Sequence, residues 1–504
     1  MKKNNVIRKN FIFIVLIYCS VFLSAQQQIY ELDLQKSIDI ALEKSYTIKT
    51  LKADLKVAEY NLQSANRSFR THLDLVLTVP NYAESLRKWE DSTGISYYPI
   101  KQMNYSGYVN LWQPLPTDGK ISLTSGLDNT DDFMEDKKSF AFSNRIEFEQ
   151  PIEALYSYNR IRSEFKRAKL NYELSNKQLK RTELDLIYYV SNSFYELVSA
   201  KERKNISYQS LLRQDEVYKI AQKKYESGLI REVEALQMEV DLAGARNEYD
   251  QADINHMSVS NDFKQLLGIS LYDSIIINSD LSYDLILIDL QKAIDLGIKN
   301  RLEIREKEIQ IELNEISLKE FRSRGLIRGK INAYYDFTGV DDKELPITFS
   351  NAFDNSWQDL RRRPNNRGIG LTLSVPIWDW GENRSLVNAQ KARIERAMYS
   401  LDDTKVDIEK EIINTVNRLN SALRRLQLLE KSVQVAEKSF AISSTRFVNG
   451  DIDSESLALE RERLNNAYVS RLNAFISYKL LLADLTRQTF FDFLKNKSLV
   501  EPVE

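Results

Sequence analysis

The stretch Ile408–Gly450 reads IEKEIINTVNRLNSALRRLQLLEKSVQVAEKSFAISSTRFVNG and decides the fold. Steps of four and three residues through it follow one mainly apolar stripe: Ile408, Ile412, Thr415, Leu419, Ala422, Leu426, Leu429, Val433, Ala436, Phe440, Ser443 and Phe447. This heptad repeat predicts a helix from about Arg384 to Phe447, on the order of 95 Å long at 1.5 Å per residue. Because a helix of that length is not a globular element, it must pack lengthwise against similar helices.

Prolines and tryptophans gather in two windows that separate the helical stretches. Eight of the nine prolines lie there: Pro80, Pro99, Pro114, Pro116, Pro151, Pro346, Pro364 and Pro376. All five tryptophans lie in or just beyond the same windows. Since proline removes an N–H and clashes with the preceding turn, the windows exclude long helices. The chain is therefore expected to alternate helix, window, helix, window, helix.

Apolar and polar residues alternate with a period of two inside the windows. The clearest runs are residues 72–79, 140–149, 331–337 and 369–375, which predict strands with one apolar and one polar face. A soluble sandwich would show the same pattern, but strands of about 9 to 11 residues, flanking aromatic residues and a secretory signal favour a transmembrane barrel. The apolar face would contact lipid, and Arg145, Glu147, Glu149 and Asp336 would face a water-filled lumen.

The chain is predicted to contain two structural repeats. Residues 33–39 read DLQKSID and residues 289–295 read DLQKAID, while Pro151-Ile152 ends the first window as Pro376-Ile377 ends the second. We expect a first repeat over 26–285 with strands about 71–151, a second over 286–490 with strands about 330–376, and a tail over 491–504. Gly228 and Gly450 are the expected reversal points of two long helical hairpins, because glycine adopts the left-handed conformation without a Cβ penalty.

Residues 1–25 have the layout of a secretory signal, with a basic start, an apolar run and small residues before Gln26. The apolar run is too short to span a bilayer. Cys19, the only cysteine, would leave with the signal, which excludes disulfides and thiolate chemistry from the mature chain. A lipid anchor on Cys19 is disfavoured because Tyr18 stands where a small residue is needed.

Charge and motifs exclude several classes of function. Loss of the signal would change the formal net charge from −2 to −6, which disfavours nucleic acid as a partner. His72 and His256 are the only histidines, so no metal or cofactor is expected. The chain has no phosphate-binding glycine loop and no Gly-x-Ser-x-Gly motif, and an enzyme is not expected. The acidic run 128–136 and the basic run 361–363 are expected in outward loops, either solvated or paired with other subunits or lipid phosphates.

The predicted strands require more than one copy of the chain. Two strands per repeat give four strands per chain, which cannot close a barrel or pair their edge N–H and C=O groups in lipid. Two copies would give about eight strands, too narrow for a water-filled pore, whereas three give about twelve, so a homotrimer is predicted. The segment Tyr105–Leu127 is a possible further hairpin that would extend above the membrane or enlarge the barrel.

These features resemble the TolC-type outer-membrane efflux proteins over nearly the whole mature chain. The resemblance rests on the opening Leu32-x-Leu34-x-x-Ser37-Ile38-x-x-Ala41-Leu42, the strand ends Gln150-Pro151-Ile152 and Val375-Pro376-Ile377-Trp378, Gly381, and both Tyr/Phe-x-x-Gly turns. It implies an α+β, mostly α fold: a trimeric twelve-stranded outer-membrane β-barrel continued by a periplasmic tunnel of α-helices. It also implies a passive exit duct of a tripartite efflux or type I secretion system.

The same resemblance implies partners and sites. The partners are a periplasmic adaptor (membrane fusion protein), an inner-membrane pump of RND or ABC type, and outer-membrane lipid. The adaptor would dock on the hairpin turns, at Tyr225, Gly228, Leu229, Phe447, Gly450 and Asp451. Well-known members carry an aspartate ring after the second turn; alignment at Gly450 places Ser456 and Leu459 there, with Asp453 and Glu455 nearby. These acids would form a periplasmic constriction or simply stabilise a helix N-terminus.

Two rival interpretations share part of this pattern. A periplasmic coiled-coil adaptor or structural protein would have the signal and the heptads but would need no lipid-facing strands and no pore. A self-contained porin would place most of its chain in strands instead of helices.

Overall fold

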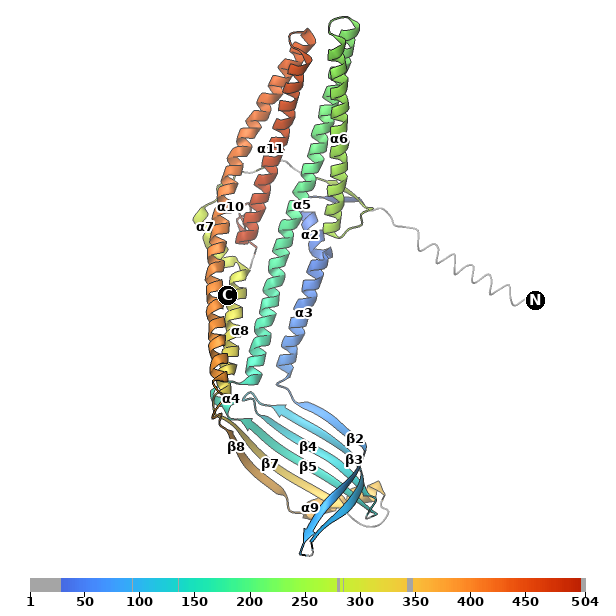
Figure 1. The fold of residues 1–504 in the computed structure, drawn as a ribbon, viewed down its shortest axis with the longest axis vertical. Helices are drawn as coiled ribbons and strands as arrows, with labels where there is room; N and C mark the ends of the chain where they lie inside the picture. The colour runs from blue at the N-terminus through green and yellow to red at the C-terminus, as the bar shows by residue number, and fades with distance from the viewer. Residues whose placement is uncertain are drawn as a thin grey trace, which may run out of the picture. The chain divides into compact units, whose positions relative to one another are not determined.

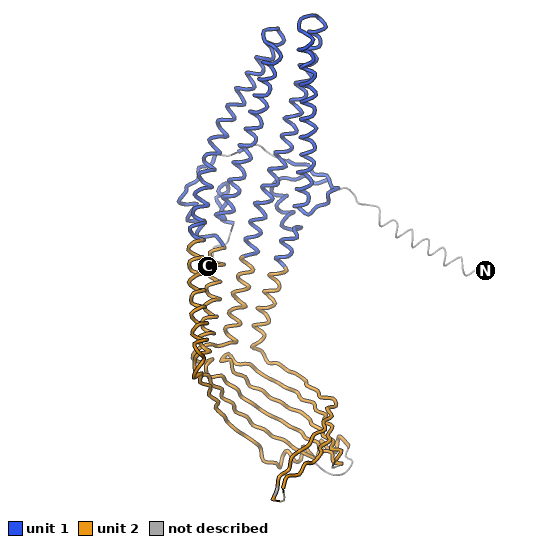
Figure 2. The backbone as a smooth tube through the Cα atoms, in the orientation of Figure 1, with its two compact units in different colours: residues 1–52, 178–302, 404–504 blue, residues 53–177, 303–403 orange. Residues whose placement is uncertain are grey.

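The computed structural model describes residues 29–92, 94–134, 136–278, 282–283, 285–341 and 348–499 (Figure 1). The predicted signal segment and Cys19 lie outside these residues. The chain divides into two compact units (Figure 2). Unit 1 takes its residues from 1–52, 178–302 and 404–504, and unit 2 from 53–177 and 303–403. Each unit therefore contains segments from both predicted repeats.

Unit 2 contains an antiparallel sheet in which six described strands follow the order β2-β3-β4-β5-β7-β8. Their bounds, in that order, are His72–Asp91, Gly94–Pro114, Lys120–Asp132, Lys137–Pro151, Arg328–Asp341 and Asn366–Ser374. The four strands expected from the alternation are β2, β5, β7 and β8. The segment Tyr105–Leu127, a possible further hairpin from the sequence, supplies parts of β3 and β4. Four barrel strands were predicted, and this sheet has six among the described residues.

The additional hairpin is hard to recognise in the sequence because Gly107 of β3 and Ser125 of β4 interrupt its apolar row, while the large ring of Tyr108 stands in its polar row. Gly126 of β4 pairs with Tyr108 of β3. A Cβ on Gly126 would lie 2.1 Å from the Tyr108 ring, so the large ring occupies the space of two side chains. The alternation of apolar and polar residues is therefore weaker here than in the four strands that were predicted.

The sheet has a helix end and a loop end. At the helix end, β2 and β7 begin and β5 and β8 end, so that His72 pairs with Trp112 and Arg328 pairs with Ser374. The turns β2–β3 and β4–β5, and the connection β7–β8, lie at the opposite, loop end. One face of the sheet is apolar and well exposed, with side chains of Leu73, Leu75, Leu77, Ile146, Leu371 and Leu373. The other face is polar.

Four helices lead into or out of the helix end of the sheet: α3 (Tyr46–Arg67), α5 (Arg160–Glu226), α8 (Leu302–Arg324) and α10 (Glu382–Asn449). The predicted helix from Arg384 to Phe447 is confirmed as α10. Within unit 2, α5 and α8 pack through Leu170, Ile309 and Ile316. The short α4 (Glu153–Tyr156) follows β5, and α9 (Phe349–Arg362) connects β7 to β8 and packs against β5 and β7.

Unit 1 contains the hairpin helices α6 (Glu232–Leu267) and α11 (Ser454–Thr489), together with the short helices α2 (Leu34–Lys44) and α7 (Leu290–Asn300). The repeated DLQKxID motif begins each short helix. Asp33 accepts the N–H of Lys36 at 2.8 Å, and Asp289 accepts the N–H of Gln291 at 2.9 Å. Each aspartate is an N-cap, which explains why the motif starts with that residue.

An apolar core of unit 1 lies where α2 and the start of α3 meet α5 and α6. It includes Leu32, Ile48, Val190 and Phe263, beside the parallel pair β1 (Ile29–Leu32) and β6 (Ser274–Ile277). The C-terminal pair β9 (Phe491–Asp492) and β10 (Lys497–Ser498) follows α11. No helix in the described part of the chain is both long and apolar enough to cross a membrane.

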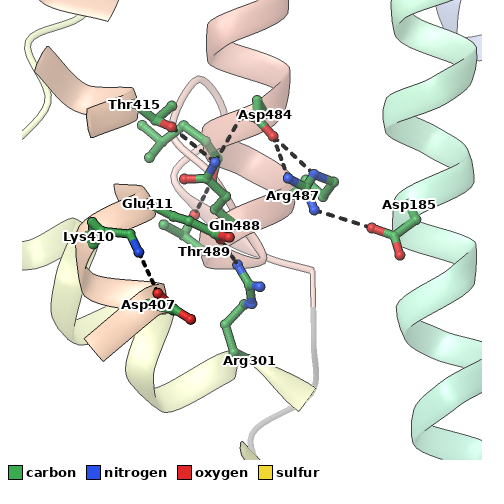
Figure 3. Close-up of polar contacts among 11 residues, drawn as sticks. Asp185, Arg301, Asp407, Lys410, Glu411, Thr415, Asp484, Arg487, Gln488 and Thr489 are labelled. Carbon is green, nitrogen blue, oxygen red and sulfur yellow. Dashed lines mark hydrogen bonds and ion pairs between the residues drawn. The ribbon is translucent and has the colours of Figure 1, made fainter. Parts of the chain in front are cut away.

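Polar contacts fasten the end of α11 to its neighbours in unit 1 (Figure 3). Arg487 donates to Asp484 at 2.7 Å and to Asp185 of α5 at 3.4 Å. Gln488, which is buried, donates to Thr415 of α10 at 3.0 Å. These contacts join α11 to both long helices at the base of the hairpins.

Candidate functional site

Both long hairpins of unit 1 reverse at a glycine in the left-handed conformation, as predicted. Gly228 has a φ of +74° and Gly450 a φ of +88°. The residues that follow, Leu229 and Asp451, donate their N–H groups to carbonyls five residues back, at 2.8 and 2.9 Å. This Schellman pattern satisfies carbonyls that a helix end otherwise leaves free. A Cβ on either glycine would meet nothing within 4 Å, so the requirement for glycine comes from the backbone alone.

A small apolar core joins the two hairpins near their turns. It contains one or two residues from each of α5, α6, α10 and α11: Val217, Ala221, Met238, Phe447 and Leu457. Phe447 is 4% exposed, because it is the last position of the heptad stripe. It is thus a packing residue in this structure and not a free docking residue. The other predicted docking residues, Tyr225, Gly228, Leu229, Gly450 and Asp451, are exposed.

Lys224 fastens the end of α5 to the second turn. Its ammonium group donates to the Phe447 carbonyl and lies 4.8 Å from the centre of the Phe447 ring. A positive charge close to the free carbonyls at a helix C-terminus is favourable. Beside this contact lies a cavity of about 380 Å³, lined by Leu229, Ile230 and Glu234 near the first turn and by residues 447–453 at the second.

The residues predicted to form a constriction lie at the start of α11. Asp453 is the N-cap and accepts the N–H of Ser456 at 2.9 Å. The hydrogen bonds from Ser456 lower the pKa of the Asp453 carboxyl. Glu455 stands in the first turn, where negative charge is favourable, and Leu459 is 49% exposed. The helix-stabilising role is confirmed for Asp453, and the constriction stays a prediction.

Two arginines of the hairpins make contacts that sequence reasoning missed. Arg461 of α11 lies 3.6 Å from Asp241 of α6, and both side chains are less than one-fifth exposed. Arg213 of α5 donates to Asn465 of α11 at 3.0 Å, and burial lowers the pKa of Arg213. No motif marks these residues, because charged side chains recur along all the long helices and only packing decides which of them meet.

The four predicted lumen residues lie together on the polar face of the sheet in unit 2. Arg145 of β5 pairs in register with Asp336 of β7, and its Nε lies 3.6 Å from that carboxylate and 3.7 Å from Glu147. Glu149 lies 2.7 Å from a lysine of β7 and 3.3 Å from a lysine of β4. Opposite charges therefore alternate across neighbouring strands, which compensates the charge of this face.

The model of one protein family, the outer membrane efflux proteins, matches residues 37–268 and 347–485, well over half of the chain. The chain belongs to the outer membrane efflux protein family. No curated protein sequence matches it at a significant level.

Solved outer-membrane channels share the fold of this efflux protein. The CmeC channel of Campylobacter jejuni is 16% identical with a TM-score of 0.64, covering 90% of this chain and 85% of CmeC. VceC of Vibrio cholerae is 15% identical with a TM-score of 0.64, covering 90% of this chain and 95% of VceC. The open-state MtrE channel of Neisseria gonorrhoeae is 14% identical with a TM-score of 0.62, covering 91% and 89%.

Family membership establishes the class of function. This efflux protein is an outer-membrane efflux channel component with a large periplasmic helical portion. Membership in this family contradicts the interpretation of the chain as a periplasmic adaptor. The predominance of helices over strands contradicts the interpretation as a self-contained porin. Proteins of this family are channels and not enzymes, and they work as trimers with adaptors and inner-membrane pumps.

Proposed function

We propose that three copies of this chain form the passive exit duct of a tripartite efflux or type I secretion system, driven by an inner-membrane pump of RND or ABC type. The observation that carries the proposal is the sheet of unit 2, which exposes an apolar face and leaves its edges open. Among the described strands, β2 and β8 each pair on one side only. Because unpaired backbone groups are costly in lipid, neighbouring copies must complete the sheet.

The strand directions support closure between copies. β2 runs away from the helix end and β8 runs toward it, so β8 of one copy would pair antiparallel with β2 of the next. Two copies would give twelve strands and three copies eighteen, and both barrels would hold water. With four strands per copy, only three copies would have given a water-filled barrel. With the six strands of this sheet, two copies would also suffice, so the strand count does not determine the number of copies. The trimeric state of the family's channels supports three.

The turns of unit 1 support adaptor docking. Leu229 is 72% exposed and lines the cavity beside the second turn, where an apolar partner would cover it. We assign Tyr225, Gly228, Gly450 and Asp451 to the same contact surface, with Phe447 holding the turns together from inside the core. The duct has no catalytic step of its own, and its energy comes from the pump.

Opening would require the two hairpins to separate. The contacts that oppose separation include the apolar core near the turns, the Lys224 contact with Phe447, the Arg213 contact with Asn465 and the ion pair between Arg461 and Asp241. We propose that adaptor binding shifts the balance between joined and separated hairpins. Acidic residues at the start of α11, Asp453 and Glu455, would then line the entrance together with Ser456 and Leu459.

Reconstitution tests the duct. The purified chain should sediment as three copies in detergent and should give stepwise ion currents in planar bilayers. A water-soluble monomer without conductance would overturn the proposal.

A matched pair of variants tests the docking surface. Leu229→Asp should weaken crosslinking to the adaptor while leaving conductance intact, because a charge replaces the apolar contact. Leu86→Asp, at a side chain 71% exposed in the hairpin β2–β3, is the control and should crosslink normally. Equal crosslinking of both variants would remove Leu229 from the docking surface.

A further inference from the structure

Helix α9 lies on the apolar face of the sheet near its loop end. Phe349 packs on Phe140 and Phe353 packs on Phe142, with ring centres 5.5 and 5.6 Å apart. Gly339 of β7 makes this approach possible, because a Cβ there would lie 1.8 Å from a backbone oxygen of α9. Figure 1 shows α9 at the end of the sheet remote from the long helices of unit 2. The helix therefore sits on the face that a barrel presents to lipid.

The side chains of α9 suit a position between lipid and water. Ala352 and Ser356 are buried against the sheet. Phe349 and Trp357 remain 67% and 40% exposed along the flanks of the helix. Amphipathic helices with exposed aromatic residues characteristically lie in the membrane interface. Since the helix end of the sheet leads to the periplasmic helices, the loop end and α9 belong to the outer leaflet.

Arginines gather where α9 ends. Arg361, Arg362 and Arg363 are all exposed. Arg363 is paired with Asp359 at 2.8 Å, and Arg361 lies over the Trp357 ring, 5.4 Å from its centre. Within the described residues, neither Arg361 nor Arg362 has an acidic partner within ion-pair distance. Two guanidinium groups are thus available beside an interfacial tryptophan.

We propose that α9 is an interfacial helix whose Arg361 and Arg362 bind phosphate groups of anionic lipid in the outer leaflet. The planar guanidinium group binds phosphate through two parallel hydrogen bonds. Stacking on Trp357 holds Arg361 at the depth where headgroup phosphates lie. The inference rests on the proposed barrel, because only an inserted sheet presents this face to lipid.

Lipid binding by the purified full chain in detergent tests the proposal. The probes are diphosphorylated lipid A, its dephosphorylated form and inorganic phosphate, and affinities are measured by native mass spectrometry. The double variant R361Q/R362Q should bind the diphosphorylated lipid on the order of 30-fold more weakly than the wild type. The control R87Q/K88Q removes two cations from the hairpin β2–β3 and should bind it normally.

Several outcomes would overturn the proposal. Equal affinity of R361Q/R362Q and wild type, or equal affinity for the dephosphorylated lipid, would show that these arginines do not bind lipid phosphate. Full displacement of the lipid by inorganic phosphate would show a simple anion site. Glutamine has a helix propensity close to that of arginine, so α9 should persist. Weaker lipid binding by the wild type at high salt is expected independently of any variant.

Conductance separates this inference from the proposed duct. If R361Q/R362Q conducts normally but binds lipid A like the wild type, only the α9 proposal fails. If the wild type neither inserts nor conducts, the proposed duct fails and the α9 proposal fails with it.

Discussion

Asp241→Asn removes one charge from the ion pair that joins the two hairpins, and we expect it to favour the open duct. The Asp241 carboxylate lies 3.6 Å from the Arg461 guanidinium, and the side chains are 17% and 19% exposed. At an effective dielectric constant of about 20, two charges at this separation attract by about 4–5 kcal/mol. Because burial also removes the hydration of both ions, we expect Asp241→Asn to lower the free energy that stabilises the joined hairpins by about 2 kcal/mol. If the pair forms only while the hairpins are joined, the open-to-closed ratio of each copy rises on the order of 30-fold.

Single-channel recording in planar bilayers measures that ratio directly. Asp215→Asn is the matched control, because Asp215 pairs with Lys219 at 2.5 Å on the exposed surface of α5 alone and should leave the ratio unchanged. Adding Arg461→Gln to Asp241→Asn should bring the open-to-closed ratio part of the way back to the wild-type value, because no unpaired buried charge then remains. Equal ratios for the wild type and Asp241→Asn, or an equal rise in Asp215→Asn, would refute the reasoning.

Three further predictions concern single residues. Gly450→Ala should lower the free energy of unfolding by about 1–2 kcal/mol, because a φ of +88° disfavours a Cβ; urea denaturation measures this, and Gly244→Ala inside α6 should not destabilise. Gly339→Ala should detach α9, because the added methyl would lie 1.8 Å from a backbone oxygen of that helix; an unshifted tryptophan emission spectrum would contradict this. The Asp453 cap should persist below about pH 4, the usual pKa range of aspartate, because folding lowers the pKa of the Asp453 carboxyl. The stabilisation by the cap is present above the pKa of the unfolded state and is lost only as the pH falls through the pKa of the folded state. Hydrogen exchange at the Ser456 amide measures the cap, and loss of its protection already at about pH 4 would contradict this prediction.

The candidate site could be predicted from the sequence only in part. Gly228 and Gly450 were predictable because a left-handed turn is a local requirement that few other residues meet. Phe447 was expected on the surface because its motif places it beside the turn, whereas the heptad stripe makes it the last core position. The pair between Asp241 and Arg461 was not predictable, because it joins two helices that are far apart in the chain.

The amino-acid sequence by itself determined the local states of the backbone. Heptads specified α10, alternating side chains specified β2, β5, β7 and β8, and the two DLQKxID motifs marked the starts of α2 and α7 through their aspartate caps. Each of these signals comes from interactions within a few residues, and such interactions can be read without knowing the partners.

Only the tertiary structure decided how many strands share the sheet, where α9 lies and which charged residues meet. The hairpin β3–β4 was obscured because Gly107 and Ser125 interrupt its apolar row and Tyr108, beside Gly126, stands in its polar row, which weakens the alternation that marks a strand. The basic run 361–363, expected in an outward loop, ends a helix that packs on the sheet because Gly339 leaves room for it. These features depend on contacts between distant segments, and packing in three dimensions selects them from many arrangements that satisfy the same local patterns.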